Sequence, residues 1–171
     1  MNLKIPKSIK AEHDSLHAQL VRIIHSGGQT QEAARRLARV LHPHFLAEEA
    51  LALPPLGVLK DLAKQRKSKQ AEKAISLSQS LERNLARMLQ DHKDIFVELK
   101  ALQAMARKEG KIQIAEFAEH LYQHARIEEE VVYPTTILIG RYLQMEQKKD
   151  EAAPAGRSRR QKSSPARPKA G

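Results

Sequence analysis

The sequence predicts an all-α protein folded as an antiparallel up-down four-helix bundle, with a short C-terminal helix and a disordered basic tail. Apolar residues make up 41% of the 171 residues and aromatic residues only 4%, while Ala, Leu, Lys, Arg, Glu and Gln are abundant. This composition favours helix over strand. Apolar residues also recur at intervals of three and four over four long segments, the period of an amphipathic helix. Four histidines lie within these apolar stripes, one on each expected helix.

The first two expected helices form a hairpin. The first covers residues 8–26, with Ser8 as its N-cap, and ends at the two glycines that follow. The second starts with Thr30 as its cap and ends at the proline-containing segment 53–57. Pro43 lies inside the second helix and should kink it, because proline removes a backbone hydrogen bond.

The remaining helices follow a basic connector over residues 58–69, for which we expect one short helix. The third long helix covers residues 71–110, and the fourth covers residues 111–133. Pro134 should end the fourth helix, and residues 135–147 should form a short fifth helix that packs back on the bundle.

Residues 147–171 differ from the rest of the chain in composition. They contain eight basic and two acidic residues, no apolar period and no aromatic residue, so we expect a disordered tail after one domain over residues 1–146. Clustered Arg and Lys can bind the phosphates of nucleic acid or an anionic membrane. A tail without aromatic residues or an amphipathic pattern is better explained as a flexible, solubilising segment.

The composition also limits the chemistry. The chain has no cysteine, which excludes disulfides, thiolate metal sites and cysteine nucleophiles, so a metal site must use His and carboxylate ligands. No segment approaches the ~20 apolar residues of a membrane span, and the first residues lack the apolar run of a signal peptide. We therefore expect a soluble, cytoplasmic protein.

The spacing of the histidines predicts a common site. One pair, His13 and His44, is separated by 31 residues, and the other, His92 and His124, by 32. Each pair is nearly symmetric about its expected turn, so its members should stand at the same height in an antiparallel hairpin. Stacking the two hairpins would bring together six ligand-type side chains: His13, His44, Glu48, His92, His124 and Glu128. Burying such groups unpaired is costly, and a metal ion would compensate them.

These segments resemble the motifs of the hemerythrin-like (HHE cation-binding) domain family over residues 8–145. The matching segments are Glu12-His13-Asp14-Ser15-Leu16, His44-Phe45-Leu46-Ala47-Glu48-Glu49, Asp91-His92-Lys93-Asp94-Ile95 and His124-Ala125-Arg126-Ile127-Glu128-Glu129. The resemblance implies an up-down four-helix bundle that holds two iron ions in a non-haem di-iron centre. It also implies a role in binding or sensing oxygen, peroxide or nitric oxide, or in handling iron.

The resemblance also implies roles for the six residues. Glu48 and Glu128 would bridge the two irons. One iron would take its imidazole ligands from the first hairpin, His13 and His44. The other iron would take them from the second hairpin, His92 and His124.

The sequence departs from oxygen-carrying hemerythrins at two positions. Phe96 stands where they have a second histidine on the third helix, and Glu128 stands where they have a bridging Asp. Each iron would then have four protein donors, which leaves coordination positions open. This donor set favours a reactive or sensing centre over an oxygen carrier.

Several alternatives remain open at this stage. His17 and His120 lie one turn from ligand histidines and are either additional ligands or neighbouring surface groups. The donor set suits iron or manganese, and zinc is a further alternative. The protein could also be a di-iron oxidase or peroxidase, although no separate acid–base residue or substrate pocket is visible, or a metal-free interaction module that uses its basic tail.

Other acidic and aromatic residues near the predicted ligands receive simpler interpretations. Glu49, Glu129 and Glu130 are interpreted mainly as a solvated acidic face, with hydrogen bonds to the ligands as the alternative. Tyr122 and Tyr133 are interpreted as packing residues rather than redox relays.

Overall fold

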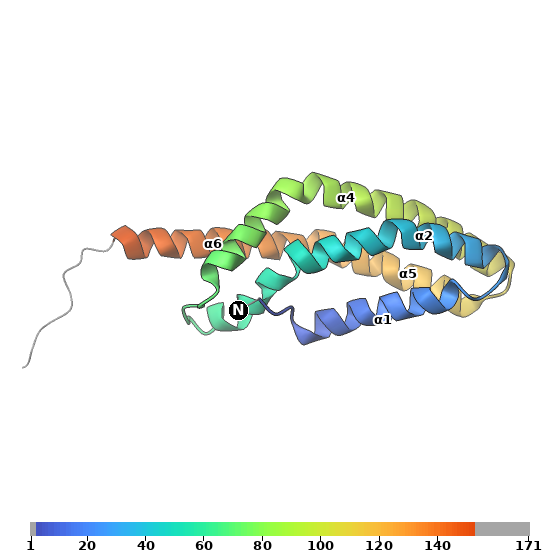
Figure 1. Cartoon of the computed structure of the whole chain (residues 1–171), viewed down its shortest axis with the longest axis horizontal. Coiled ribbons are helices and arrows are strands. Elements are labelled where there is room, and N and C mark those ends of the chain that lie inside the picture. The colour runs from blue at the N-terminus through green and yellow to red at the C-terminus, as the bar shows by residue number, and fades with distance from the viewer. Residues whose placement is uncertain (1–2, 153–171) are drawn as a thin grey trace, which may run out of the picture.

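The computed structural model describes residues 3–152, and this part of the chain is all-helical, without a strand. The prediction of an all-α fold is therefore confirmed. The long helices are α1 (Lys7–Ile23), α2 (Gly28–Ala47), α4 (Ala71–Lys108), α5 (Ile112–Ile127) and α6 (Tyr133–Ala152). The first four lie side by side as a bundle, and α6 continues in line with α5 away from the turns (Figure 1).

The α1–α2 turn and the α4–α5 turn lie at the same end of the bundle, and side chains join them (Figure 1). Glu109 accepts hydrogen bonds from the backbone N–H of Gln29, at 2.6 Å, and from the hydroxyl of Thr30. Lys111 donates to two carbonyl groups of the first turn. The prediction that Thr30 caps α2 is wrong, because α2 begins at Gly28 and the Glu109 carboxylate accepts from the backbone N–H of Gln29 in its first turn.

Two helix boundaries near prolines differ from the predictions. Pro6 directly precedes α1, which has no side-chain cap, so Ser8 is not its N-cap. Pro43 lies inside α2, as the sequence predicts. Pro134, which was predicted to end the fourth long helix, instead lies in the first turn of α6, which begins at Tyr133. Proline is tolerated there because its missing N–H would have no helical partner in a first turn.

A π-helical turn begins at the glutamate of each of the two predicted His-x-x-x-Glu pairs. These turns are η1 (Glu48–Ala52), after α2, and η3 (Glu128–Val132), after α5. In each turn, the glutamate carbonyl accepts a hydrogen bond from the N–H five residues later. A proline follows each turn, and its ring would clash with the carbonyl four residues earlier in a regular α-helix. The wider π turn avoids this clash. The chain therefore contains a longer repeat, His-x-x-x-Glu-Glu-x-x-x-(Leu or Tyr)-Pro, over residues 44–54 and 124–134.

The connector has the short helix that the sequence predicts. A 3-10 helix, η2 (Pro54–Val58), leads into α3 (Leu59–Leu62), and α4 begins after a loop. At the other end of the described chain, α6 reaches Ala152, past the predicted start of the tail at residue 147. The rest of the predicted tail, residues 153–171, lies outside the described residues.

The apolar core is divided into two clusters along the bundle. One packs α1, α2, α4 and α5 together near the turns, around Leu37 and Leu121. The other lies near η2 and α6. On α4, His92 lies between Met88 of one cluster and Ile95 of the other, so the predicted ligands occupy a polar layer between two apolar regions. Within residues 3–152, no helix is long and apolar enough to cross a membrane.

Candidate metal centre

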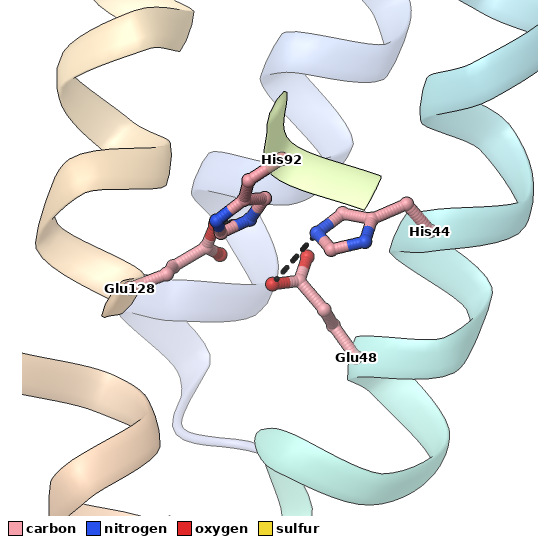
Figure 2. Close-up of side chains that lie close together, drawn as sticks. All are labelled: His44, Glu48, His92 and Glu128. Carbon is pink, nitrogen blue, oxygen red and sulfur yellow. Dashed lines mark ion pairs between the residues drawn. The ribbon is translucent and has the colours of Figure 1, made fainter. Parts of the chain in front are cut away.

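The six predicted ligand residues are all buried and lie together in the core. The exposed fraction of each is 7% or less. They form two groups, and within each group all the potential ligand atoms lie within 4.8 Å of one another. The first group comprises His44, Glu48, His92 and Glu128, and the second comprises His13, His124 and Glu128. Figure 2 shows the first group, with side chains from different helices pointing toward one another.

The two carboxylates reach toward both groups. Glu128 Oε1 lies 2.9 Å from His124 Nε2 and 3.2 Å from His13 Nε2. Its other oxygen, Oε2, lies 3.6 Å from His92 Nε2. Glu48 Oε1 lies 3.3 Å from His44 Nε2, and Glu48 Oε2 lies 3.9 Å from His13 Nε2. Glu128 therefore presents one oxygen to each group, which is the arrangement that a bridging ligand needs, and the second oxygen of Glu48 faces His13 of the other group at the longer distance.

The imidazoles pair between hairpins, whereas the resemblance implied pairing within each hairpin. His13 Nε2 lies 3.3 Å from His124 Nε2. The rings of His44 and His92 have centroids 4.5 Å apart. Both pairs lie where helices of different hairpins meet, since α1 contacts α5 and α2 contacts α4, although the helices within each hairpin also contact each other. We name the two groups the His13–His124 position and the His44–His92 position.

Each imidazole presents Nε2 to the centre and Nδ1 to a carboxylate at its outer edge. These outer contacts are His92–Glu129 at 3.0 Å, His124–Glu12 at 3.3 Å, His44–Asp91 at 3.5 Å and His13–Glu49 at 3.8 Å. The first two are within hydrogen-bond distance, and the last two are longer ion-pair contacts. Metal-bound histidines commonly have such carboxylate partners, which fix the tautomer and the ring orientation. Of the three glutamates interpreted as a solvated face, Glu49 and Glu129 therefore contact the site, whereas Glu130 pairs with Arg126 at the surface.

Sequence reasoning missed the position of Tyr133. This residue is 1% exposed, and its hydroxyl donates to Glu48 Oε1 at 2.5 Å. The three-residue step of a regular helix leads from Glu128 to Val131, which would then face the core, but Val131 is 55% exposed. The π turn causes the difference, because it rotates the residues after Glu128 relative to a regular helix. The proline shared by the two copies of the repeat was the available signal.

The two additional candidate ligands are outside the site. His17 is exposed, and its ring lies 5.8 Å from that of His42, which is also exposed. The side chain of His120 is 56% exposed, and its Nε2 lies 3.6 Å from the Glu12 carboxylate that faces His124. Neither residue belongs to the two groups of potential ligands.

Protons and hydrogen bonds compensate the buried carboxylates. Burial lowers the pKa of His124, but its hydrogen bond to Glu128 and nearby negative charge raise this pKa to about 9 overall. Burial raises the pKa of Glu128, but its bonds to three imidazoles hold this pKa well below its usual range. Burial and the neighbouring Glu48 raise the pKa of Tyr133. Glu48 Oε2 is buried without a hydrogen-bond partner, an arrangement that a bound cation would satisfy.

Comparisons with models of protein families, with curated proteins and with solved structures find no match. The fold and the site define the class by themselves. The chain is a helical bundle whose core contains buried His and Glu side chains that could hold a metal ion.

Proposed function

We propose that the protein binds two iron ions in its core and is a hemerythrin-like, non-haem di-iron protein. The observation that carries this proposal is the orientation of the four imidazoles. All four direct Nε2 toward two shared carboxylates and Nδ1 toward an outer carboxylate. Structural histidines in an apolar core have no need of this common orientation, whereas ligation of a shared metal centre accounts for it.

The donor set supports iron as the cation. Imidazoles combined with several carboxylates suit iron or manganese, while zinc sites usually have fewer carboxylates. The shared position of Glu128 in both groups supports two cations rather than one. Bound iron would supply redox chemistry and coordination positions for small oxidants.

Metal loading of matched variants tests this part of the proposal. Metal-free protein is loaded with ferrous iron under anaerobic conditions and desalted, and the iron-to-protein ratio is measured. We expect two irons per chain for the wild type and a clear loss for His44→Ala and His124→Ala. His17→Ala and His42→Ala remove exposed histidines and serve as controls that retain full loading. Equal iron content in all five proteins would contradict the proposal.

We further propose that the centre binds or senses oxygen, peroxide or nitric oxide, or handles iron. The buried position of the ligands between two apolar clusters supports a ligand as small as these molecules. The test is to expose the reduced, iron-loaded protein to each molecule and to record its visible spectrum. A spectral change complete at a stoichiometric amount supports binding or sensing. Continued consumption of peroxide would instead indicate an enzyme, and no response to any of the three would leave iron handling as the supported role.

A further inference from the structure

We infer that the oxygen of Tyr133 is an additional ligand at the His44–His92 position, so that the two cation positions are chemically unequal. This inference rests on the proposed function, because it concerns a cation in the same centre. It assigns to one position a hard, anionic oxygen donor of the phenolate type. The other position has no equivalent donor among the described residues.

The distances around the Tyr133 hydroxyl match those between ligands of one cation. Its oxygen lies 2.5 Å from Glu48 Oε1, 3.2 Å from His92 Nε2 and 3.4 Å from His44 Nε2. Cations of this class hold N and O donors at about 2.0–2.2 Å, which places neighbouring donors roughly 3 Å apart. The hydroxyl therefore lies where a further donor of the His44–His92 position would lie.

The local fold holds the hydroxyl in this place. The π turn η3 puts Tyr133 on the face of Glu128, and its ring stacks on the ring of His92 with centroids 5.6 Å apart and an interplanar angle of 18°. Tyr133 is the first residue of α6, and α6 packs on α4. A buried, immobilised side chain loses little further freedom when it binds a cation.

The second copy of the repeat explains why only one position has this donor. Leu53 follows η1 as Tyr133 follows η3, but Leu53 has no polar atom. Near the His13–His124 position, the ring that stacks on His13 belongs to Phe45, with centroids 4.5 Å apart. The repeat therefore supplies one hydroxyl to a site that is otherwise nearly symmetric.

The chemistry of the step is the replacement of a proton by the cation on the Tyr133 oxygen, without electron transfer. The O–H bond of Tyr133 breaks, its proton leaves to solvent, and the oxygen forms a bond to the cation. Its hydrogen bond to Glu48 Oε1 is lost, which frees that carboxylate oxygen for the same cation. An anionic oxygen binds a hard trivalent cation strongly. We therefore expect the His44–His92 position to retain ferric iron and the His13–His124 position to exchange it more readily.

The visible spectrum of the ferric protein tests the inference. Phenolate bound to ferric iron gives a charge-transfer band in the visible region, and excitation in this band enhances the Raman vibrations of a tyrosinate ring. Oxo, imidazole and carboxylate ligands do not give these ring vibrations. The chain has only three tyrosines, so each can be replaced in turn.

We expect the ring vibrations in the wild type, in Tyr122→Phe and in Tyr142→Phe, and their loss in Tyr133→Phe. We also expect Tyr133→Phe to lower the cation affinity of the His44–His92 position at least about tenfold. Because Tyr133 is buried, circular dichroism of that variant checks its fold. A wild-type spectrum without tyrosinate vibrations overturns the inference without any variant.

The outcomes separate this inference from the proposed function. A wild type that binds two irons without tyrosinate vibrations overturns the inference and leaves the di-iron proposal standing; Tyr133 would then only hydrogen bond to Glu48. A wild type that binds no iron overturns both. Tyrosinate vibrations that persist in Tyr133→Phe also overturn the inference.

Discussion

At the scale of single residues, protons occupy a site that we propose for cations. The His124 imidazole lies 2.9 Å from a Glu128 oxygen, and this partner raises the pKa of His124 to about 9 despite its burial. At neutral pH, His124 therefore carries a proton in the metal-free protein. A protonated imidazole cannot bind a metal, so the cation must displace this proton.

The affinity for a cation should therefore rise with pH. Between about pH 6.5 and 8.5, we expect an increase of about tenfold per pH unit for each proton displaced. The measurement is a competition titration of the metal-free protein with cobalt(II), which avoids oxidation during the experiment. An affinity that does not change over this range would mean that His124 is already neutral.

The same shift has the opposite effect on the stability of the metal-free protein. Because the folded-state pKa of His124 is raised, its contribution to stability is fully present below its unfolded value of about 6.5. This contribution is lost as the pH rises through about 9. Thermal unfolding of the metal-free protein at a series of pH values should show a fall across this window. His124→Ala should show a smaller fall, and an equal fall in both proteins would contradict the assignment.

At the scale of helical elements, two π turns decide which residues reach the site. A regular helical period correctly placed His124 and Glu128 on one face, because His124 lies in α5 and Glu128 is the first residue of η3, before the wider turn changes the period. The same period failed for Val131 and Tyr133, which follow the start of the turn. A helical pattern assumes a constant number of residues per turn. A π turn contains one extra residue, so the pattern misassigns the residues after it unless the π turn itself is recognised.

The packing of α6 on α4 holds Tyr133 at the centre, and Gly140 makes this packing possible. A Cβ atom at position 140 would lie 2.4 Å from Ser78 Cβ. We expect Gly140→Ala to lower the free energy of unfolding by about 1–3 kcal/mol through overpacking. Chemical denaturation measures this change. Leu138→Ala, on the same helix but with its side chain 65% exposed, is the control and should stay within about 0.5 kcal/mol of the wild type. Equal stability of all three proteins would mean that α4 and α6 can move apart at position 140 without loss of stability.

At the scale of the whole molecule, a layer of buried ionisable groups divides the apolar core. The sequence predicted this layer well for two reasons. Each pair of histidines is nearly symmetric in sequence around the turn of its hairpin, and each histidine lies in an apolar stripe. It did not predict which imidazoles would pair, because helix neighbours across hairpins depend on the assembled bundle. The outer carboxylates Glu12 and Asp91 were also missed, since neither lies in an apolar stripe.

A cation in this layer should stabilise the entire fold. A ligand present at a hundredfold excess over its Kd adds about 2.7 kcal/mol. For a chain of this size, such a gain corresponds to a Tm increase of roughly 5–10 °C. Differential scanning calorimetry with and without ferrous iron measures this shift. His44→Ala and His124→Ala should lose most of it, and His17→Ala should keep it. A wild-type Tm that is unaffected by iron would contradict a site in the core.

The most direct test of the central claim is an anomalous-difference map at the iron absorption edge, from crystals of the iron-loaded protein. We predict two peaks in the polar layer. One peak should lie between His44 and His92 and the other between His13 and His124, with Glu128 in contact with both. A map without peaks in this layer, or with peaks only at exposed histidines such as His17, would contradict the account.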